Sequence, residues 1–82
     1  MADSEIIFYG TSWCPDCHRA QRVFDQYMIG YRFINIDQDN EARSFVESVN
    51  QGMRSVPTIV FPEGDILVEP MDSELAERLE KL

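Results

Sequence analysis

Basic residues are scarce in this chain of 82 residues: seven, of which one is a lysine, against fifteen acidic residues. The resulting formal net charge of −8 argues against a nucleic-acid partner, because that binding depends on Lys and Arg neutralising phosphates. An acidic surface also weakens the capture of anionic ligands by field repulsion. We therefore expect no nucleic acid among its partners.

Long apolar runs, internal repeats and low-complexity linkers are also absent. No run approaches the roughly 20 apolar residues of a membrane span, and residues 1–5 lack the basic segment and apolar core of a secretion signal. We therefore expect a cytoplasmic protein without membrane contact. A chain of this length has no room for two cores, so we expect one domain over residues 1–82, acting as a monomer.

Cysteine is limited to two residues, Cys14 and Cys17, in the string Cys14-Pro15-Asp16-Cys17. An apolar run precedes the string and a stretch with helical spacing follows it. A C-x-x-C motif at a strand-to-helix junction is typical of a thioredoxin-like redox site. Without a secretory context, two close cysteines favour a reactive dithiol over a structural disulfide.

Apolar periodicity predicts alternating strands and helices. Strands are expected over residues 5–9, 31–36, 58–61 and 66–68. Three helices are expected, with inner faces formed by Ala20, Val23, Phe24, Tyr27 and Met28; by Ala42, Phe45, Val46 and Val49; and by Leu75, Ala76, Leu79 and Leu82. Gly30 is expected to end the first helix, Asp37 or Asp39 to cap the second, and Asp72 or Ser73 to cap the third.

The order of these elements is βαβ followed by ββα. The first unit requires parallel strands joined by a right-handed crossover, and the hairpin adds antiparallel strands. The fold class is therefore α/β. The expected architecture is a minimal thioredoxin fold, with a four-stranded mixed sheet flanked by three helices.

The two cysteines are expected to play different roles. Pro15 suits the first helical turn, which places Cys14 at the N-cap. Its sulfur can then accept hydrogen bonds from free amides such as that of Cys17 and lie at the positive end of the helix, which favours the thiolate. Asp16 disfavours the thiolate, by about 1 kcal/mol in solvent. Cys17 should be more shielded and have a higher pKa, so Cys14 attacks and Cys17 resolves the mixed disulfide.

Three neighbours of the dithiol carry alternative interpretations. Trp13 is either a flat contact surface for partners, a lid over the sulfur, or simply packed in the loop. Arg19 and Arg22 either offset the charge of Asp16 or are ordinary solvated charges.

Other chemistries also use these residue types. Cys14 to His18 matches the C-x-x-C-H haem-attachment string, but covalent haem normally requires export. Zinc would use Cys14, Cys17 and His18, but a structural site needs a fourth ligand. Two further functions remain as alternatives: a redox-responsive binding module without turnover, and an iron–sulfur or zinc carrier bridged through Cys14. The leading interpretation requires no bound metal or organic cofactor.

Val56-Pro57-Thr58 is the second informative string. A proline directly before an apolar strand is confined to its start or to a bulge. If the Val56–Pro57 bond is cis, the backbone N–H and C=O of Val56 face outward beside the dithiol. An extended substrate can then pair with them as a short added strand. A trans proline opening the strand is the alternative.

Residues 9–20 resemble the active-site segment of glutaredoxins, and Val56-Pro57-Thr58 resembles their cis-proline loop. Residues 45–50 and 54–58 are similar to the mycoredoxin-like branch, which reduces mixed disulfides formed with mycothiol. The resemblance implies that Cys14 is the nucleophile, Cys17 the resolving thiol and Pro57 a cis-proline. It also implies a thiol–disulfide oxidoreductase acting on protein disulfides or mixed disulfides. Mycothiol, glutathione or a thioredoxin-reductase-like flavoenzyme would supply its electrons.

The chain departs from the usual family pattern at three places, the first of which is Asp16, where an aromatic residue is usual. Thr11 stands where glutathione-using members often carry a lysine, and residues 69–73 replace a Gly-Gly pair that precedes an acid. Asp72 remains available as that acid. The resemblance therefore makes Thr11 and Asp72 candidate substrate contacts, beside Val56 and Pro57.

Overall fold

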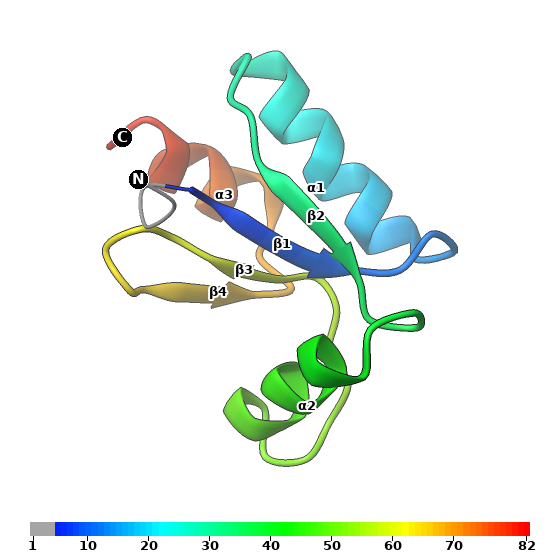
Figure 1. Cartoon of the computed structure of the whole chain (residues 1–82). Helices are drawn as coiled ribbons and strands as arrows, with labels where there is room; N and C mark the ends of the chain where they lie inside the picture. Colours follow the sequence, from blue (N-terminus) through cyan, green and yellow to red (C-terminus); the bar gives the residue numbers. More distant parts are fainter. Residues whose placement is uncertain (1–4) are drawn as a thin grey trace.

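Seven elements form the molecule in the computed structural model, which describes residues 5–82. In chain order they are β1 (Ile7–Gly10), α1 (Pro15–Gln26), β2 (Arg32–Asn35), α2 (Asn40–Val49), β3 (Thr58–Val60), β4 (Ile66–Val68) and α3 (Asp72–Leu79). The sheet separates α1 and α3 on one face from α2 on the other (Figure 1). This confirms the predicted fold class and element order.

The sheet has the strand order β2-β1-β3-β4. β1 pairs in parallel with β2 and antiparallel with β3, and β3 forms an antiparallel hairpin with β4. Gly10 lies opposite Asn35, and Tyr9 lies opposite Thr58. The ends of β1 and β2 and the start of β3 therefore meet at one edge. This register brings together three loops that are far apart in the sequence.

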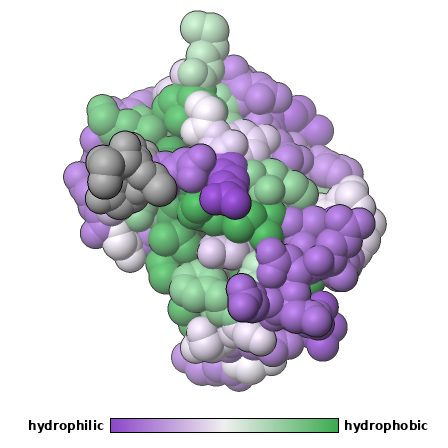
Figure 2. All heavy atoms as spheres, viewed as in Figure 1, coloured by the Kyte–Doolittle hydropathy of each residue, from purple (hydrophilic) through white to green (hydrophobic). Residues whose placement is uncertain are grey.

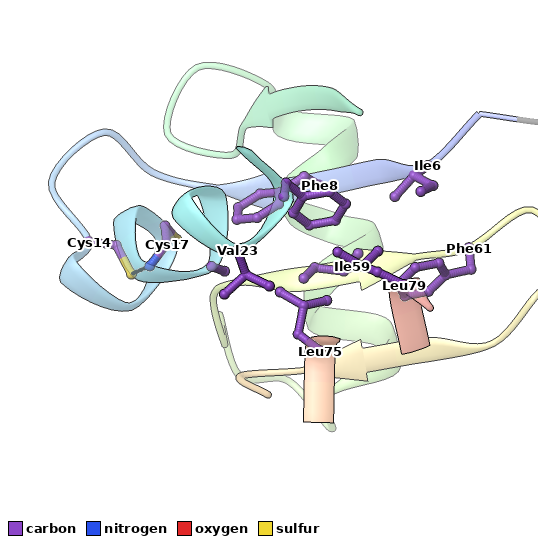
Figure 3. Close-up of a cluster of buried hydrophobic side chains, with 11 residues drawn as sticks. Ile6, Phe8, Cys14, Cys17, Val23, Ile59, Phe61, Leu75 and Leu79 are labelled. Atoms are coloured by element: carbon purple, nitrogen blue, oxygen red, sulfur yellow. Dashed lines mark hydrogen bonds between the residues drawn. The ribbon is translucent and has the colours of Figure 1, made fainter. Parts of the chain in front are cut away.

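Buried side chains form a core on each face of the sheet. The larger core lies against α1 and α3 and includes Phe8, Phe24, Ile59, Phe61, Leu75 and Leu79; Cys14 and Cys17 lie at one end of it (Figure 3). Ile36, Ala42 and Val46 form the smaller core under α2. Met28, Val49 and Leu82 were predicted on inner faces but are exposed, because each lies at or beyond the last packed turn of its helix.

Some predicted boundaries were wrong. α1 ends at Gln26 rather than at Gly30, because the chain turns at Met28, which has a φ of 54°. The N–H of Ile29 then donates to the carbonyl of Phe24 at 3.1 Å and closes the helix end.

The helix caps resolve the predicted alternatives. Asp39, and not Asp37, caps α2, and its carboxylate accepts the Ala42 N–H at 3.0 Å. Neither Asp72 nor Ser73 caps α3. Met71 occupies the N-cap in an extended conformation, its N–H donating to Glu74 at 3.4 Å. Asp37 and Asp72 are thus available for other contacts.

Figure 2 shows one face of the molecule. Its right side is mostly hydrophilic, and hydrophobic residues gather along its middle. Within residues 5–82, no helix combines the length and apolar character needed to cross a membrane.

Candidate active site

Cys14 lies at the N-cap of α1, as predicted. Its backbone is extended, with φ −85° and ψ 115°, and Pro15 opens the helix. The N–H of Cys17 donates to the Cys14 sulfur at 3.1 Å. The sulfur therefore receives a directed amide and lies at the positive end of a twelve-residue helix, an arrangement that stabilises negative charge. Both cysteines are free thiols.

Cys17 is completely buried, which confirms the prediction that it is the more shielded thiol. Burial and, next in size, the hydrogen bond with Cys14 together raise the pKa of Cys17 to about 12, against a smaller lowering by the Thr11 backbone. A Cβ added to Gly10 would lie 2.9 Å from the Cys17 sulfur. The end of β1 therefore packs directly against this thiol.

The Val56–Pro57 bond is cis, and it lies beside the dithiol. The Cys14 sulfur donates a long hydrogen bond, 3.9 Å, to the carbonyl oxygen of Val56. The carbonyl of Pro57 accepts the N–H of Glu69 at 2.8 Å, and the hydroxyl of Thr58 donates to Ser55 at 2.7 Å. These bonds fix the loop, and the Val56 carbonyl faces the reduced Cys14 sulfur.

The charge of Asp16 is partly neutralised within the site. Arg19 bridges the carboxylates of Asp16 at 2.6 Å and Asp72 at 2.9 Å. These side chains are about half exposed, so each pair contributes at most about 1 kcal/mol to stability. The contact confirms that Arg19 offsets the acidic residue between the cysteines.

A groove of about 450 Å³ opens over Cys14. Its lining residues are Trp13, Cys14, Pro15, Asp16, Met53, Arg54, Ser55, Val56 and Glu69. Trp13 and Met53 are 66% and 65% exposed, so two large apolar side chains border the groove and face solvent. The Trp13 indole N–H donates to the carboxylate of Asp37 at 2.8 Å. The groove can accept a substrate group whose sulfur reaches Cys14.

The sequence model of the glutaredoxin family matches residues 6–66. The chain belongs to the glutaredoxin family. Mycoredoxin 1 of Corynebacterium glutamicum is 37% identical over 79 residues, which cover 96% of this glutaredoxin and 98% of that protein.

Two solved structures share the fold of this glutaredoxin. A glutaredoxin from Archaeoglobus fulgidus has a TM-score of 0.67 at 26% identity, covering 96% of this chain and 85% of that one. A thioredoxin-like protein has a TM-score of 0.71 at 21% identity, covering 94% and 97%. These comparisons confirm the predicted resemblance and fold, and this glutaredoxin is a thiol–disulfide oxidoreductase of glutaredoxin type.

Three predicted substrate contacts, Thr11, Pro57 and Asp72, do not line the groove of this glutaredoxin. Pro57 is fully buried. Thr11 is 2% exposed, and its hydroxyl has no hydrogen-bond partner among the described residues. Asp72 is bound by Arg19 and lines a neighbouring hollow with Met71 and Ser73. Trp13, Pro15, Asp16 and Val56 do line the groove with Cys14.

Sequence reasoning missed four residues that line the groove: Met53, Arg54, Ser55 and Glu69. The first three directly precede Val56-Pro57, so their nearness to the cis-proline loop was a usable signal. Glu69 follows β4 and begins residues 69–73, which stand at the Gly-Gly positions of glutathione-using members, so the resemblance was a usable signal for it. Among residues 5–82, no group of three or more His, Cys, Asp or Glu side chains is placed to hold a metal ion.

Proposed function

We propose that this glutaredoxin reduces mixed disulfides between proteins and low-molecular-weight thiols, and also protein disulfides, through Cys14 and Cys17. The observation that carries the proposal is the position of the Cys14 sulfur, which accepts the Cys17 N–H at 3.1 Å and lines the groove. Disulfide exchange requires a sulfur that can reach the bound disulfide, and the Cys14 sulfur lines the groove whereas Cys17 does not. Cys14 is therefore the proposed nucleophile.

In the first step the Cys14 thiolate attacks one sulfur of the substrate disulfide. A bond forms between Cys14 and that sulfur, the substrate S–S bond breaks, and the other sulfur leaves as a thiolate. Cys17 does not compete, because its pKa of about 12 keeps it a protonated thiol at neutral pH. The Val56 carbonyl, next to Cys14, is the proposed backbone contact for the bound substrate.

In the second step Cys17 loses its proton and attacks the Cys14 sulfur. The mixed disulfide breaks, the second thiol leaves, and an intramolecular Cys14–Cys17 disulfide remains. Once Cys14 is in a mixed disulfide it carries no negative charge, so the part of the raised Cys17 pKa that Cys14 causes is removed. Two molecules of an external thiol, which leave as their own disulfide, or a reductase then supply the two electrons and two protons that restore the dithiol.

The charges of the groove favour an uncharged thiol conjugate. Glu69 is acidic, Arg19 neutralises Asp16 only in part, and the guanidinium of Arg54 is engaged by Glu47 at 2.9 Å. Glutathione carries a net negative charge at neutral pH and would be repelled. We therefore propose mycothiol as the preferred thiol. The similarity to a mycoredoxin supports this choice.

The electron donor can be named by one experiment. The oxidised protein is exposed separately to mycothiol, to glutathione, and to NADPH with thioredoxin reductase, then quenched with an alkylating agent. Intact mass counts the thiols that each donor frees. Selective release of two thiols by mycothiol is the expected result. Persistence of the disulfide with every donor would instead favour a redox-responsive binding module.

Single serine variants test the two thiol roles. Cys14→Ser should abolish exchange, whereas Cys17→Ser should retain monothiol turnover or accumulate a mixed disulfide on Cys14. Initial rates of thiol release from a protein mixed disulfide, with intact mass of the trapped species, measure both. An equal loss of exchange activity in the two variants would contradict the assignment of Cys14 as nucleophile and Cys17 as resolving thiol.

A further inference from the structure

The loop that carries the dithiol is tied to the loop after β2. β1 and β2 are parallel neighbours, and their last residues, Gly10 and Asn35, lie opposite each other. The segments that follow therefore leave the sheet at the same edge (Figure 1). Trp13 and Asp37, 24 residues apart in the sequence, meet there through the 2.8 Å bond from the indole N–H.

This bond is a main restraint on a side chain that packing does not fix. Trp13 is 66% exposed, although it directly precedes Cys14 and borders the groove. An exposed indole samples several rotamers unless a polar contact selects one. The bond to Asp37 selects the orientation in which the ring forms a wall of the groove.

Asp37 is itself held in place by its own turn. The side-chain oxygen of Asn35 accepts the N–H of Asp37 at 2.9 Å, and the carbonyl of Asn35 accepts the N–H of Gln38 at 3.1 Å. This Asx turn presents the carboxylate toward Trp13. Asp37 does not cap α2, since Asp39 performs that role. Its carboxylate is thus directed to the active-site loop.

We propose that Asp37 is a positioning residue for substrate recognition, holding the Trp13 indole as the wall against which the thiol-bearing group of the substrate packs. The proposal builds on the proposed exchange reaction at Cys14. It places the effect in substrate binding, since neither Asp37 nor the indole N–H touches the reacting sulfur atoms. The substrate surface that it selects is an apolar or uncharged face next to the sulfur.

The test compares Asp37→Ala with Asp37→Asn, which keeps an acceptor oxygen. Asp25→Ala is the matched control, because it also removes an exposed aspartate carboxylate, but one near the far end of α1, about 15 Å along the helix from its start. Steady-state rates use a protein mixed disulfide formed with mycothiol. Asp37→Ala should raise KM about three- to tenfold with kcat nearly unchanged, the loss expected for one hydrogen bond that serves binding. Asp37→Asn should have a KM close to that of the wild type, and Asp25→Ala should behave as the wild type.

Fluorescence gives a readout that does not depend on turnover, because Trp13 is the single tryptophan of the chain. Asp37→Ala should change the emission maximum and increase quenching by acrylamide, whereas Asp37→Asn and Asp25→Ala should not. In a Trp13→Phe background, removing the Asp37 carboxylate should no longer change KM.

Two results would overturn the proposal: an unchanged KM and emission in Asp37→Ala, or a loss confined to kcat. Loss of turnover in the wild type as well, with the fluorescence changes intact, would refute the proposed reaction and leave the Trp13 contact established. A Tm of Asp37→Ala equal to that of the wild type excludes misfolding as the cause of its raised KM.

Discussion

Selective alkylation offers a direct check on the difference between the two thiols. With a pKa of about 12, Cys17 is about one part in 100,000 thiolate at pH 7. A free cysteine is about 3% thiolate at that pH, which is roughly 3,000 times more. A more basic thiolate is intrinsically more nucleophilic, and this offsets about 40-fold of the difference. Cys17 should therefore react about 80 times more slowly than a free cysteine, before its complete burial adds to the effect.

The assay treats the reduced native protein with iodoacetamide at pH 7 and follows intact mass over time. One adduct should form quickly on Cys14, and the second should appear only after unfolding in guanidinium. Cys17→Ser should give the same single fast adduct, whereas Cys14→Ser should give none on that timescale. Burial, the largest cause of the raised Cys17 pKa, persists in Cys14→Ser.

The pH dependence has a definite sign. Each unit of pH below about 12 increases the Cys17 thiolate about tenfold, so its alkylation rate should rise steadily from pH 7 to pH 10. Two adducts forming at similar rates in the native protein at pH 7 would refute the reasoning. So would alkylation of Cys14→Ser as fast as a free cysteine.

Two further substitutions test the packing and capping described above. Asp39→Ala removes the acceptor for the Ala42 N–H and should lower the free energy of unfolding, measured by urea denaturation, by about 1 kcal/mol. Asp39→Asn should retain most of the wild-type stability. An unchanged urea midpoint in Asp39→Ala would contradict the role of Asp39 as the cap. Gly10→Ala places a Cβ 2.9 Å from the Cys17 sulfur and should lower the free energy of unfolding by about 1–3 kcal/mol. It should also slow closure of the Cys14–Cys17 disulfide, which is measured by quenching the free thiols over time. Gly30→Ala, which meets nothing within 4 Å, is its control, and equal closure rates would show that the Gly10 contact is not required.

Local sequence was sufficient to predict the order of the elements and the position of the dithiol at the start of a helix. Apolar spacing located all three helices, and Pro15 placed Cys14 at the N-cap with the Cys17 amide on its sulfur. These features depend on residues within a few positions of one another. Boundaries were less well predicted, because Met28 adopts a left-handed turn that the more permissive Gly30 was expected to supply.

The contacts around the dithiol depended on the register of distant strands. Thr11 was a candidate substrate contact but lies buried behind the loop. Asp72 was another candidate but is taken up by Arg19, because α3 packs against α1. Residue identity did not reveal either outcome, since each depends on which helix face or loop side points inward.

The sequence by itself determined a βαβ–ββα chain with a C-x-x-C pair at a helix start, because periodicity, caps and helix dipoles act over a few residues. The tertiary structure alone decided what surrounds that pair. Pairing of Tyr9 with Thr58 brings Val56 and Pro57 to Cys14, and pairing of Gly10 with Asn35 brings Asp37 to Trp13. Such contacts join residues 24 to 42 positions apart, and their geometry is set only when the strands align.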